Sequence, residues 1–185
     1  GRGGAMFGTR LWNVKADLWC LAKGISSGYV PLGATAIGAK VAEAFMDDPT
    51  GQAAVGHGYT YSAHPVAAAA ALATLDQIEA LDVPGNAARV GAHFQARVRP
   101  FAERFSFVGD VRGMGLMLGI EMVADKATRA TLPRGNPVAA KVAQAAYRRG
   151  LMVRISGPNL ILSPPLVITR EEVDFMVDAL EGAFA

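Results

Sequence analysis

The sequence predicts an α/β chain in two parts, residues 1–82 and residues 83–185. In the first part, short apolar runs that are typical of strands alternate with segments of helical pattern. In the second part, helices with apolar stripes accompany short strands, which predicts a small α+β unit with a sheet and covering helices. Residues 81–86 combine Pro, Gly and Asn, which marks the boundary. A chain of 185 residues can bury one comfortable core or two small ones.

The first part contains two predicted strands, residues 17–22 and 34–37, and a helix over residues 39–46. The apolar run 17–22 predicts a strand buried in the core. Pro65 opens a long helix at its first position, where the helix does not need the missing N–H. Residues 66–72 are mostly alanine, so another backbone can approach closely, which favours a place in a crowded centre.

The second part begins with a helix over residues 87–105 and two strands. The helix carries an apolar stripe at helical spacing, which consists of Val90, Phe94, Val98 and Phe101. Residues 107–113 and 116–122 are the predicted strands, and a glycine-bearing turn joins them.

Capping residues mark the helices that follow. Residues 136–137 (Asn-Pro) are expected as cap and first residue of a helix that ends at Gly150. Residues 151–154 and 159–162 are predicted as short strands. The sequence Thr-Arg-Glu-Glu at 169–172 is a capping box, so the last helix is expected to begin there.

Composition excludes several classes of protein. The 18 basic and 16 acidic side chains give a formal charge of +2, and without a long basic run neither a nucleic acid nor an anionic membrane is expected as partner. No apolar stretch reaches the roughly 18 residues of a membrane span. Cys20 is the only cysteine, so no disulfide framework can form, and a reducing, cytoplasmic location fits best.

Lys23 carries the strongest chemical signal. It follows the apolar run that ends at Ala22 and precedes residues 24–33, a loop rich in Gly, Ser and Pro. An ammonium at the buried end of a strand is costly without a partner, and desolvation favours the neutral amine that covalent catalysis needs. On chemistry alone the alternative is a lysine whose stem packs at the strand edge while its ammonium reaches water.

Four segments, in the same order along the chain, resemble the class III (omega) aminotransferases, which use pyridoxal 5'-phosphate (PLP). Residues 22–34 (AKGISSGYVPLGA) resemble the family's lysine segment. Residues 1–8 (GRGGAMFG) are similar to the end of its glycine-arginine stretch, and residues 57–65 (HGYTYSAHP) to its His-Gly-x-Thr-Tyr and His-Pro block. Residues 153–154 (VR), followed by residues 163–169 (SPPLVIT), resemble its C-terminal arginine and proline pair.

The resemblance implies a fold-type I PLP-transferase. Residues 1–82 would be the C-terminal part of the PLP-binding large domain, and residues 83–185 the small domain. The chain would be a C-terminal fragment, because the family's ring-nitrogen carboxylate, ring-stacking aromatic and phosphate cup lie upstream. Such a fragment is expected to be inactive alone and a poor folder, with an unpaired edge of the family's parallel sheet and an apolar face exposed beside Leu18 and Leu21.

The resemblance also assigns three site residues. Lys23 is expected to form the Schiff base with PLP and to move a proton between the substrate carbon and the cofactor. Thr60 follows Gly56 and Gly58, which leave backbone N–H groups free near it, and it is expected to bind the phosphate held by the neighbouring subunit, which implies an obligate homodimer with a shared site. Arg154 is expected to pair with a substrate carboxylate. From the residues alone, a capping or turn role is favoured for Thr60, and the alternative to substrate binding for Arg154 is a surface salt bridge.

Two other groups are expected to be structural. Arg112 matches a further block of the family that we interpret as structural. His57 and His64 are seven residues apart with no carboxylate between them, so no metal site is expected.

The expected activity is transfer of an amino group from an amine or ω-amino acid to pyruvate or another 2-keto acid, as in the amine–pyruvate group of the family. Another class III activity, an ornithine- or diamine-type aminotransferase or an aminomutase, is the enzymatic alternative. The alternative from a different class is a non-catalytic remnant that keeps the alanine-rich helix and the Thr60 loop as a dimerisation surface. The intact Lys23 argues against the remnant.

Overall fold

The computed structural model describes residues 1–185, which fall into two compact units. The lysine unit consists of Trp12–Leu81, and the sheet unit joins Gly1–Leu11 to Asp82–Ala185. The break after Leu81 lies one residue from the boundary expected from the sequence. Residues 1–11, however, pack with the second half of the chain, which no sequence pattern indicated.

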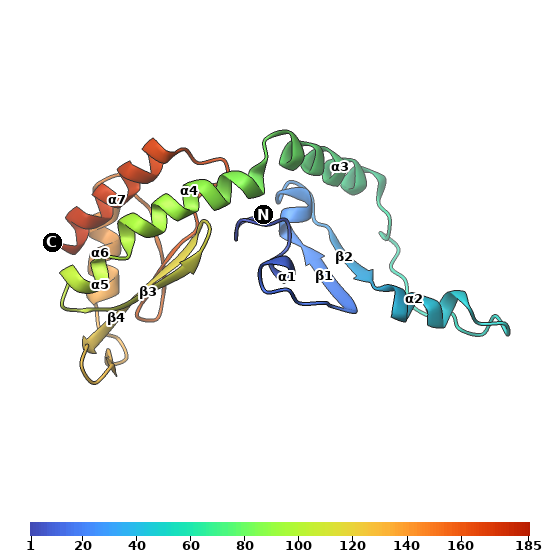
Figure 1. Ribbon diagram of the computed structural model, residues 1–185, viewed down its shortest axis with the longest axis horizontal. Coiled ribbons are helices and arrows are strands. Elements are labelled where there is room, and N and C mark those ends of the chain that lie inside the picture. The colour runs from blue at the N-terminus through green and yellow to red at the C-terminus, as the bar shows by residue number, and fades with distance from the viewer. The chain divides into compact units, whose positions relative to one another are not determined.

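The lysine unit is built on two strands, β1 (Leu18–Ala22) and β2 (Gly33–Ile37), which pair antiparallel along their whole length. The 3₁₀-helix η1 (Lys23–Ser26) follows β1 directly and begins the connection to β2 (Figure 1). Two helices complete the unit, α2 (Ala39–Met46) and α3 (Pro65–Ala80), and α3 packs on η1. The strands and helices predicted for this region are confirmed.

The strand β1 is not buried, which corrects the expectation of a core strand. Leu18 is 56% exposed and Trp19 37% exposed, and Cys20 is exposed as well. The alanine-rich helix α3 likewise buries only Ala67 and Ala71. Two strands and one packed helix supply no second layer over the other face of the ribbon, so apolar side chains stay on the surface.

The sheet unit holds a five-stranded antiparallel sheet in the order β3–β4–β7–β6, with the short β5 beside β4. Its strands are β3 (Val108–Met114), β4 (Met117–Asp125), β5 (Ala130–Thr131), β6 (Arg154–Ser156) and β7 (Asn159–Leu162). Its helices are α1 (Gly8–Leu11), α4 (Val83–Val98), α5 (Phe101–Arg104), α6 (Val138–Tyr147) and α7 (Arg170–Phe184). No helix in the structure is both long and apolar enough to cross a membrane.

The core of the sheet unit lies between the sheet and its helices, since α4 and α6 pack on the strands and α7 packs on α4 and α6 (Figure 1). The predicted apolar stripe is confirmed, since Phe94, Val98 and Phe101 are completely buried. From Leu118 to Met122 of β4 alternate side chains are buried, because successive side chains of a strand point to opposite faces. This core fixes the position of β6 and β7, and β6 carries Arg154, the candidate substrate-binding residue.

Several predicted helix ends are confirmed, but the helix predicted over residues 87–105 begins earlier, at Val83, and is divided into α4 and α5. In the capping box, the Thr169 hydroxyl accepts the N–H of Glu172 at 3.2 Å, and the Glu172 carboxylate accepts the N–H of Thr169 at 2.8 Å. Gly150 follows α6 with a φ of +85°, as expected of a glycine at a helix C-terminus. The amide oxygen of Asn136 accepts the N–H of Val138, so α6 begins one residue later than predicted.

Residues 1–11 join the sheet unit through a close approach of backbones. The N–H of Leu116 donates to the carbonyl oxygen of Arg2 at 2.9 Å. Gly115 lies at this contact, and a Cβ atom there would overlap the Arg2 carbonyl oxygen. A Cβ atom at Gly91, in α4, would in turn overlap the backbone of Gly115. Glycine at both positions therefore lets α4, the β3–β4 turn and the N-terminal segment meet.

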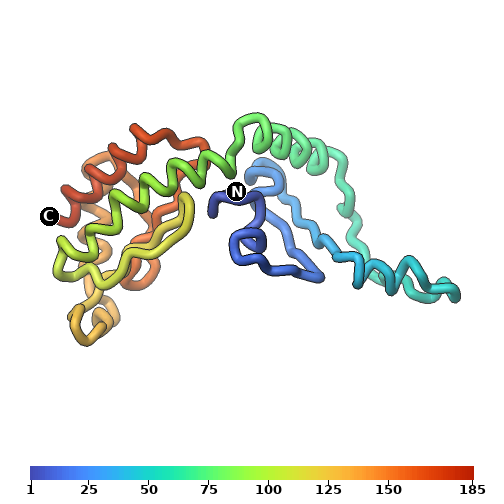
Figure 2. The backbone as a smooth tube through the Cα atoms, viewed as in Figure 1, coloured from blue at the N-terminus to red at the C-terminus, as the bar shows by residue number.

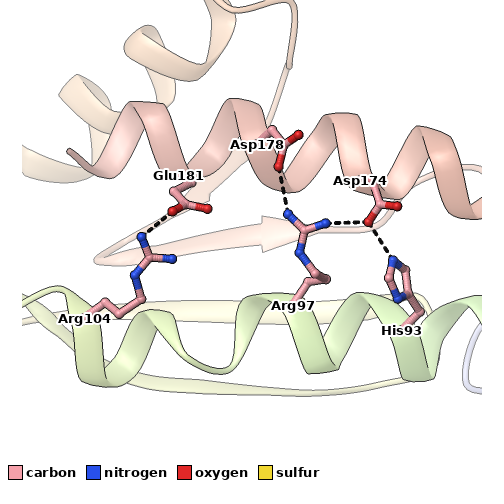
Figure 3. A network of polar contacts seen from close by, with 6 residues as sticks. All are labelled: His93, Arg97, Arg104, Asp174, Asp178 and Glu181. Carbon is pink, nitrogen blue, oxygen red and sulfur yellow. Dashed lines mark hydrogen bonds and ion pairs between the residues drawn. The ribbon is translucent and has the colours of Figure 1, made fainter.

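The helices α4 and α7 run side by side (Figure 2). A network of polar contacts links this pair and α5 (Figure 3), and it consists of His93, Arg97, Arg104, Asp174, Asp178 and Glu181. Arg97 bridges two turns of α7, with distances of 2.5 Å to Asp174 and 2.7 Å to Asp178. His93 Nε2 lies 2.6 Å from the same carboxylate oxygen of Asp174. Partly exposed ion pairs add at most about 1 kcal/mol each, so the network aligns the helices more than it stabilises them.

Asp174 makes this alignment sensitive to pH. The hydrogen bond with His93 is the main cause that lowers the pKa of Asp174 below its usual 3.8, and Arg97 lowers it further. A carboxyl group with a lowered pKa in the folded state adds stability above its unfolded pKa, and the contribution is lost as the pH falls through the folded value. We therefore expect Asp174→Asn to unfold at a lower temperature than the wild type near neutral pH.

The difference between the two proteins should shrink as the pH falls from about 5 to about 2, because the wild-type carboxylate becomes protonated. Thermal unfolding followed by circular dichroism at several pH values between about 2 and about 7 measures this difference in unfolding temperature. Asp76→Asn, at an exposed position without an ion pair, is the control and should keep the wild-type pH profile. A difference that stays constant down to pH 2 would contradict the role of the Asp174 charge.

Candidate active site

Lys23 stands where β1 turns into η1, and its backbone is strained. Its φ is +53°, in the left-handed region that a non-glycine residue adopts at a cost of about 1–3 kcal/mol. The carbonyl oxygen of Lys23 accepts the N–H of Gly28 at 3.2 Å, and Gly28 itself has a φ of +80°. Strain of this kind persists where the surrounding structure imposes it, and it concentrates at functional sites.

The side chain of Lys23 is exposed, and its ammonium makes no hydrogen bond or ion pair within the chain. The burial expected from the sequence is therefore wrong for this chain, because β1 itself is uncovered. The turn instead presents the amine outward from a fixed backbone. A primary amine held in this way can form a covalent bond with a carbonyl compound.

Ser26 anchors the turn below Lys23. Its side chain is 1% exposed, and its hydroxyl donates to the carbonyl oxygen of Val30 at 2.6 Å. The carbonyl oxygen of Ser26 accepts the N–H of Tyr29 at 3.0 Å. The sequence did not distinguish Ser26 from its neighbour Ser27, because only the packing of α3 on η1 shows which serine is buried.

Thr60 lies in an exposed turn that precedes α3. The turn is closed by the N–H of Ser62, which donates to the carbonyl oxygen of Tyr59 at 2.9 Å, and by the Ser62 hydroxyl, which accepts the N–H of Tyr59 at 3.2 Å. The Thr60 hydroxyl takes no part in these bonds and is exposed. His64 occupies the N-cap of α3 without a side-chain cap bond, and no group of three or more His, Cys, Asp or Glu side chains is placed to hold a metal ion.

Three glycines beside these residues have no structural cause within the chain. A Cβ atom at Gly24, Gly56 or Gly58 would meet nothing within 4 Å, and none of the three has a positive φ. Neither crowding nor backbone conformation therefore requires glycine at these positions. Space kept free beside an exposed amine and an exposed hydroxyl is suited to a group from outside the chain.

The residues present fit part of a PLP site. PLP offers an aldehyde that reacts with a primary amine and a phosphate that accepts hydrogen bonds. Lys23 supplies the amine, and Thr60 supplies a hydroxyl donor next to the unbonded N–H groups of Gly56 and Gly58. No residue of the chain is assigned to the nitrogen or the faces of the pyridine ring.

Arg154 opens β6 and pairs with Ile161 of β7, which corrects its expected place at the end of a strand. Its exposed guanidinium makes no ion pair within the chain. It borders a cavity of about 470 Å³ whose lining is otherwise uncharged. The lining consists of Leu151, Met152, Val153, Arg154, Ile161, Leu162, Ser163, Pro164, Pro165 and Met176. One guanidinium in an apolar cavity suits a carboxylate attached to an apolar group.

The three predicted site residues are divided between the two units. Lys23 and Thr60 belong to the lysine unit, and Arg154 belongs to the sheet unit. Within the lysine unit, no hydrogen bond joins Lys23 to Thr60. All three carry an exposed polar group without a partner in the chain.

Arg112 behaves differently and fits its expected structural role. Its guanidinium pairs with Glu121 and with Asp110, the latter at 3.0 Å. These two carboxylates, Glu121 first, raise the pKa of Arg112 above its usual value. An arginine already engaged in this way has little capacity left for a substrate.

The sequence profile of the class-III aminotransferases matches residues 1–184, and the chain belongs to this family. The expected recognition is thereby confirmed. An uncharacterized aminotransferase, y4uB, of Sinorhizobium fredii is 44% identical over 185 residues, which cover 99% of this chain and 40% of the relative. Gamma-aminobutyrate transaminase 1 of Oryza sativa subsp. indica is 36% identical over 186 residues, which cover 98% of this chain and 36% of the relative.

Solved structures agree in fold. An amine transaminase from an uncultivated Pseudomonas species, in its PLP-bound form, has a TM-score of 0.94 and 49% identity, over 100% of this chain and 41% of that one. An (S)-enantioselective ω-transaminase from Thermomicrobium roseum has a TM-score of 0.89 and 39% identity, over 99% of this chain and 40% of that one. The predicted fold class, part of a PLP-dependent aminotransferase fold, is confirmed. The chain spans about 40% of the length of these relatives.

Proposed function

We propose that the protein containing this chain is a PLP-dependent ω-transaminase. It would move an amino group from an amine or ω-amino acid to pyruvate or another 2-keto acid. The observation that carries the proposal is Lys23, an exposed amine on a strained turn within the family's lysine segment. Relatives described as a gamma-aminobutyrate transaminase and as amine transaminases support this range of amino donors.

The lysine unit would belong to the cofactor-binding domain, and residues 83–185 would form the small domain. Lys23 would hold the aldehyde of PLP through its ε-amine. Thr60 would donate to the phosphate bound by a second subunit, so that the active protein is a homodimer with shared sites. The exposed Thr60 turn and the empty space at Gly56 and Gly58 support this placement.

The chemistry divides between the cofactor and the chain. When bound, PLP supplies the electron sink that stabilises negative charge at the substrate carbon bearing the amino group. Lys23 would accept the proton from that carbon and would donate it to the C4′ carbon of the cofactor, so that one positioned amine serves as general base and general acid. Arg154 orients substrates that carry a carboxylate, because its planar fork matches the two carboxylate oxygens.

The first test identifies the lysine. The full polypeptide that contains residues 1–185 should, after loading with PLP and borohydride reduction, carry the label on Lys23 in peptide mapping. Lys23→Met should lose the label and the visible absorbance of the bound cofactor. Lys40→Met, at an exposed position on α2, should keep both. A label on Lys15 or Lys40 in the wild type would refute the assignment.

The second test concerns the phosphate. Thr60→Ala removes one hydrogen bond to a charged group, worth about 1.5–3 kcal/mol. The dissociation constant for PLP should rise roughly ten- to a hundredfold, and Thr60→Ser should restore most of it. Thr50→Ala, an exposed threonine that bonds only to its own loop, is the matched control. Equal PLP affinity of Thr60→Ala and wild type would exclude the contact.

The third test concerns acceptor choice. Loss of one partner of an arginine–carboxylate pair in a partly dry cavity costs about 2–5 kcal/mol. Arg154→Ala should therefore raise the KM for pyruvate roughly 30-fold or more. The KM for an arylalkylamine donor, which has no carboxylate, should rise far less. Arg170→Ala, exposed and without an ion pair, serves as control. Equal losses for both substrates would show that Arg154 is structural.

A further inference from the structure

One wall of the Arg154 cavity has few backbone groups that can hold it in place. The wall consists of Ser163, Pro164 and Pro165, which follow the end of β7 at Leu162. Proline has no N–H, so Pro164 and Pro165 cannot donate to a neighbouring strand. The position of this wall therefore depends on bonds to its carbonyl oxygens and on packing.

Arg2 supplies such a bond to the wall itself, and Asn86 binds the residues that follow the wall, including Ile168, whose N–H donates to the carbonyl oxygen of Pro165 at 3.2 Å. Arg2 Nη1 donates to the carbonyl oxygen of Pro164 at 2.6 Å and to that of Leu116 at 3.3 Å. Asn86 Nδ2 donates to the carbonyl oxygens of Leu166 at 2.9 Å and Ile168 at 3.1 Å. Arg2 and Asn86 therefore hydrogen-bond to carbonyl oxygens on the two sides of Pro165, at Pro164 before it and at Leu166 and Ile168 after it.

Arg2 can hold the wall in position because its own backbone is held by a hydrogen bond. Its carbonyl oxygen accepts the N–H of Leu116 at 2.9 Å, at the contact with Gly115 where no side chain would fit. The main chain and the side chain of Arg2 thus bind the same β3–β4 turn. The guanidinium then reaches from this turn to the proline wall.

The charge of Arg2 has no carboxylate partner. Its guanidinium donates only to carbonyl oxygens, unlike Arg97, Arg104 and Arg112, which all pair with acidic side chains. Partial burial lowers the pKa of Arg2 from its usual value. A partly buried charge without an ion pair is unfavourable by itself, and charged donors make the stronger hydrogen bonds to carbonyls. The guanidinium of Arg2 is thus engaged in hydrogen bonds that fix the wall at Pro164.

We propose that Arg2 is a positioning residue for carboxylate substrates, with Asn86 as its partner. By fixing Pro164, Arg2 sets the shape of the cavity beside Arg154 and so the fit of the substrate's carboxylate end. The proposal rests on the proposed transaminase function and adds to it two residues that touch neither cofactor nor substrate. Small displacements of a positioning group are enough to lower rates strongly.

Steady-state kinetics of the full PLP-loaded protein test the role. Arg2→Met keeps the length of the side chain but removes the donors. Its kcat/KM for pyruvate should fall roughly ten- to a hundredfold, while kcat/KM for a carboxylate-free arylalkylamine stays within about threefold. Arg2→Lys, which can still reach one carbonyl, should recover part of the loss. Arg149→Met, which removes an arginine bond to the carbonyl of Ala145, neither residue being part of the cavity lining, should leave both values unchanged.

A double-mutant cycle with Arg154 separates positioning from general stability. If Arg2 acts through the Arg154 cavity, Arg2→Met should change kcat/KM for pyruvate by less than about threefold in an Arg154→Ala background. Additive losses in the cycle, or equal losses for pyruvate and the amine, would overturn the proposal. If Arg2→Met does not fold, Asn86→Ala is measured in the same cycle and must show the same pyruvate-selective, non-additive loss.

These outcomes are distinct from failure of the proposed function. A wild-type protein without transaminase activity and without label on Lys23 would refute the function itself. An active wild type whose Arg2 and Asn86 variants lose activity toward both substrates alike would leave the function intact and refute only the positioning role.

Discussion

The sheet unit depends on the contact among Gly91, Gly115 and Arg2, where three backbone segments meet. Helix α4, the β3–β4 turn and the N-terminal segment can approach so closely because two of the three residues lack a side chain. The contact joins residues 1–11 to the sheet unit. It also places the Arg2 side chain at the carbonyl of Pro164. The shape of the Arg154 cavity thus follows from a backbone contact outside it.

The polar side chains of the chain divide into engaged and unengaged groups. Arg97, Arg104 and Arg112 form ion pairs with acidic side chains of the same unit. These pairs hold neighbouring helices or strands together. Lys23 and Arg154 have no such partner, although one sits on a strained turn and the other borders a cavity. A charged group that the fold positions but does not neutralise is available to a ligand. The combination of a missing partner with a strained turn or a cavity separates Lys23 and Arg154 from Arg97, Arg104 and Arg112.

Much of the secondary structure was predictable because its causes are local. The stripe through Phe94 and Phe101, the capping box at Thr169 and the terminal Gly150 all lie where periodicity and capping place them. The motifs predicted which residues belong to the candidate site, but they did not predict how exposed those residues are or what they contact. Lys23 is exposed and not buried, since a strand is covered only if a second layer exists, and its short apolar run carries no information about that layer.

The amino-acid sequence by itself therefore determined most of the elements and their order, the family motifs and the chemical groups available for catalysis, but not the short elements α1, η1 and β5. Only the tertiary structure decided which unit residues 1–11 join, that Ser26 and not Ser27 is buried, and that Arg2 binds Pro164 of the cavity wall while Asn86 binds Leu166 and Ile168 just beyond it. The reason is sequence separation, since the Arg2–Pro164 bond joins residues 162 positions apart and the Asn86–Leu166 bond residues 80 positions apart. Periodicity and capping act within a few residues, whereas such bonds exist only after the core has brought distant segments together.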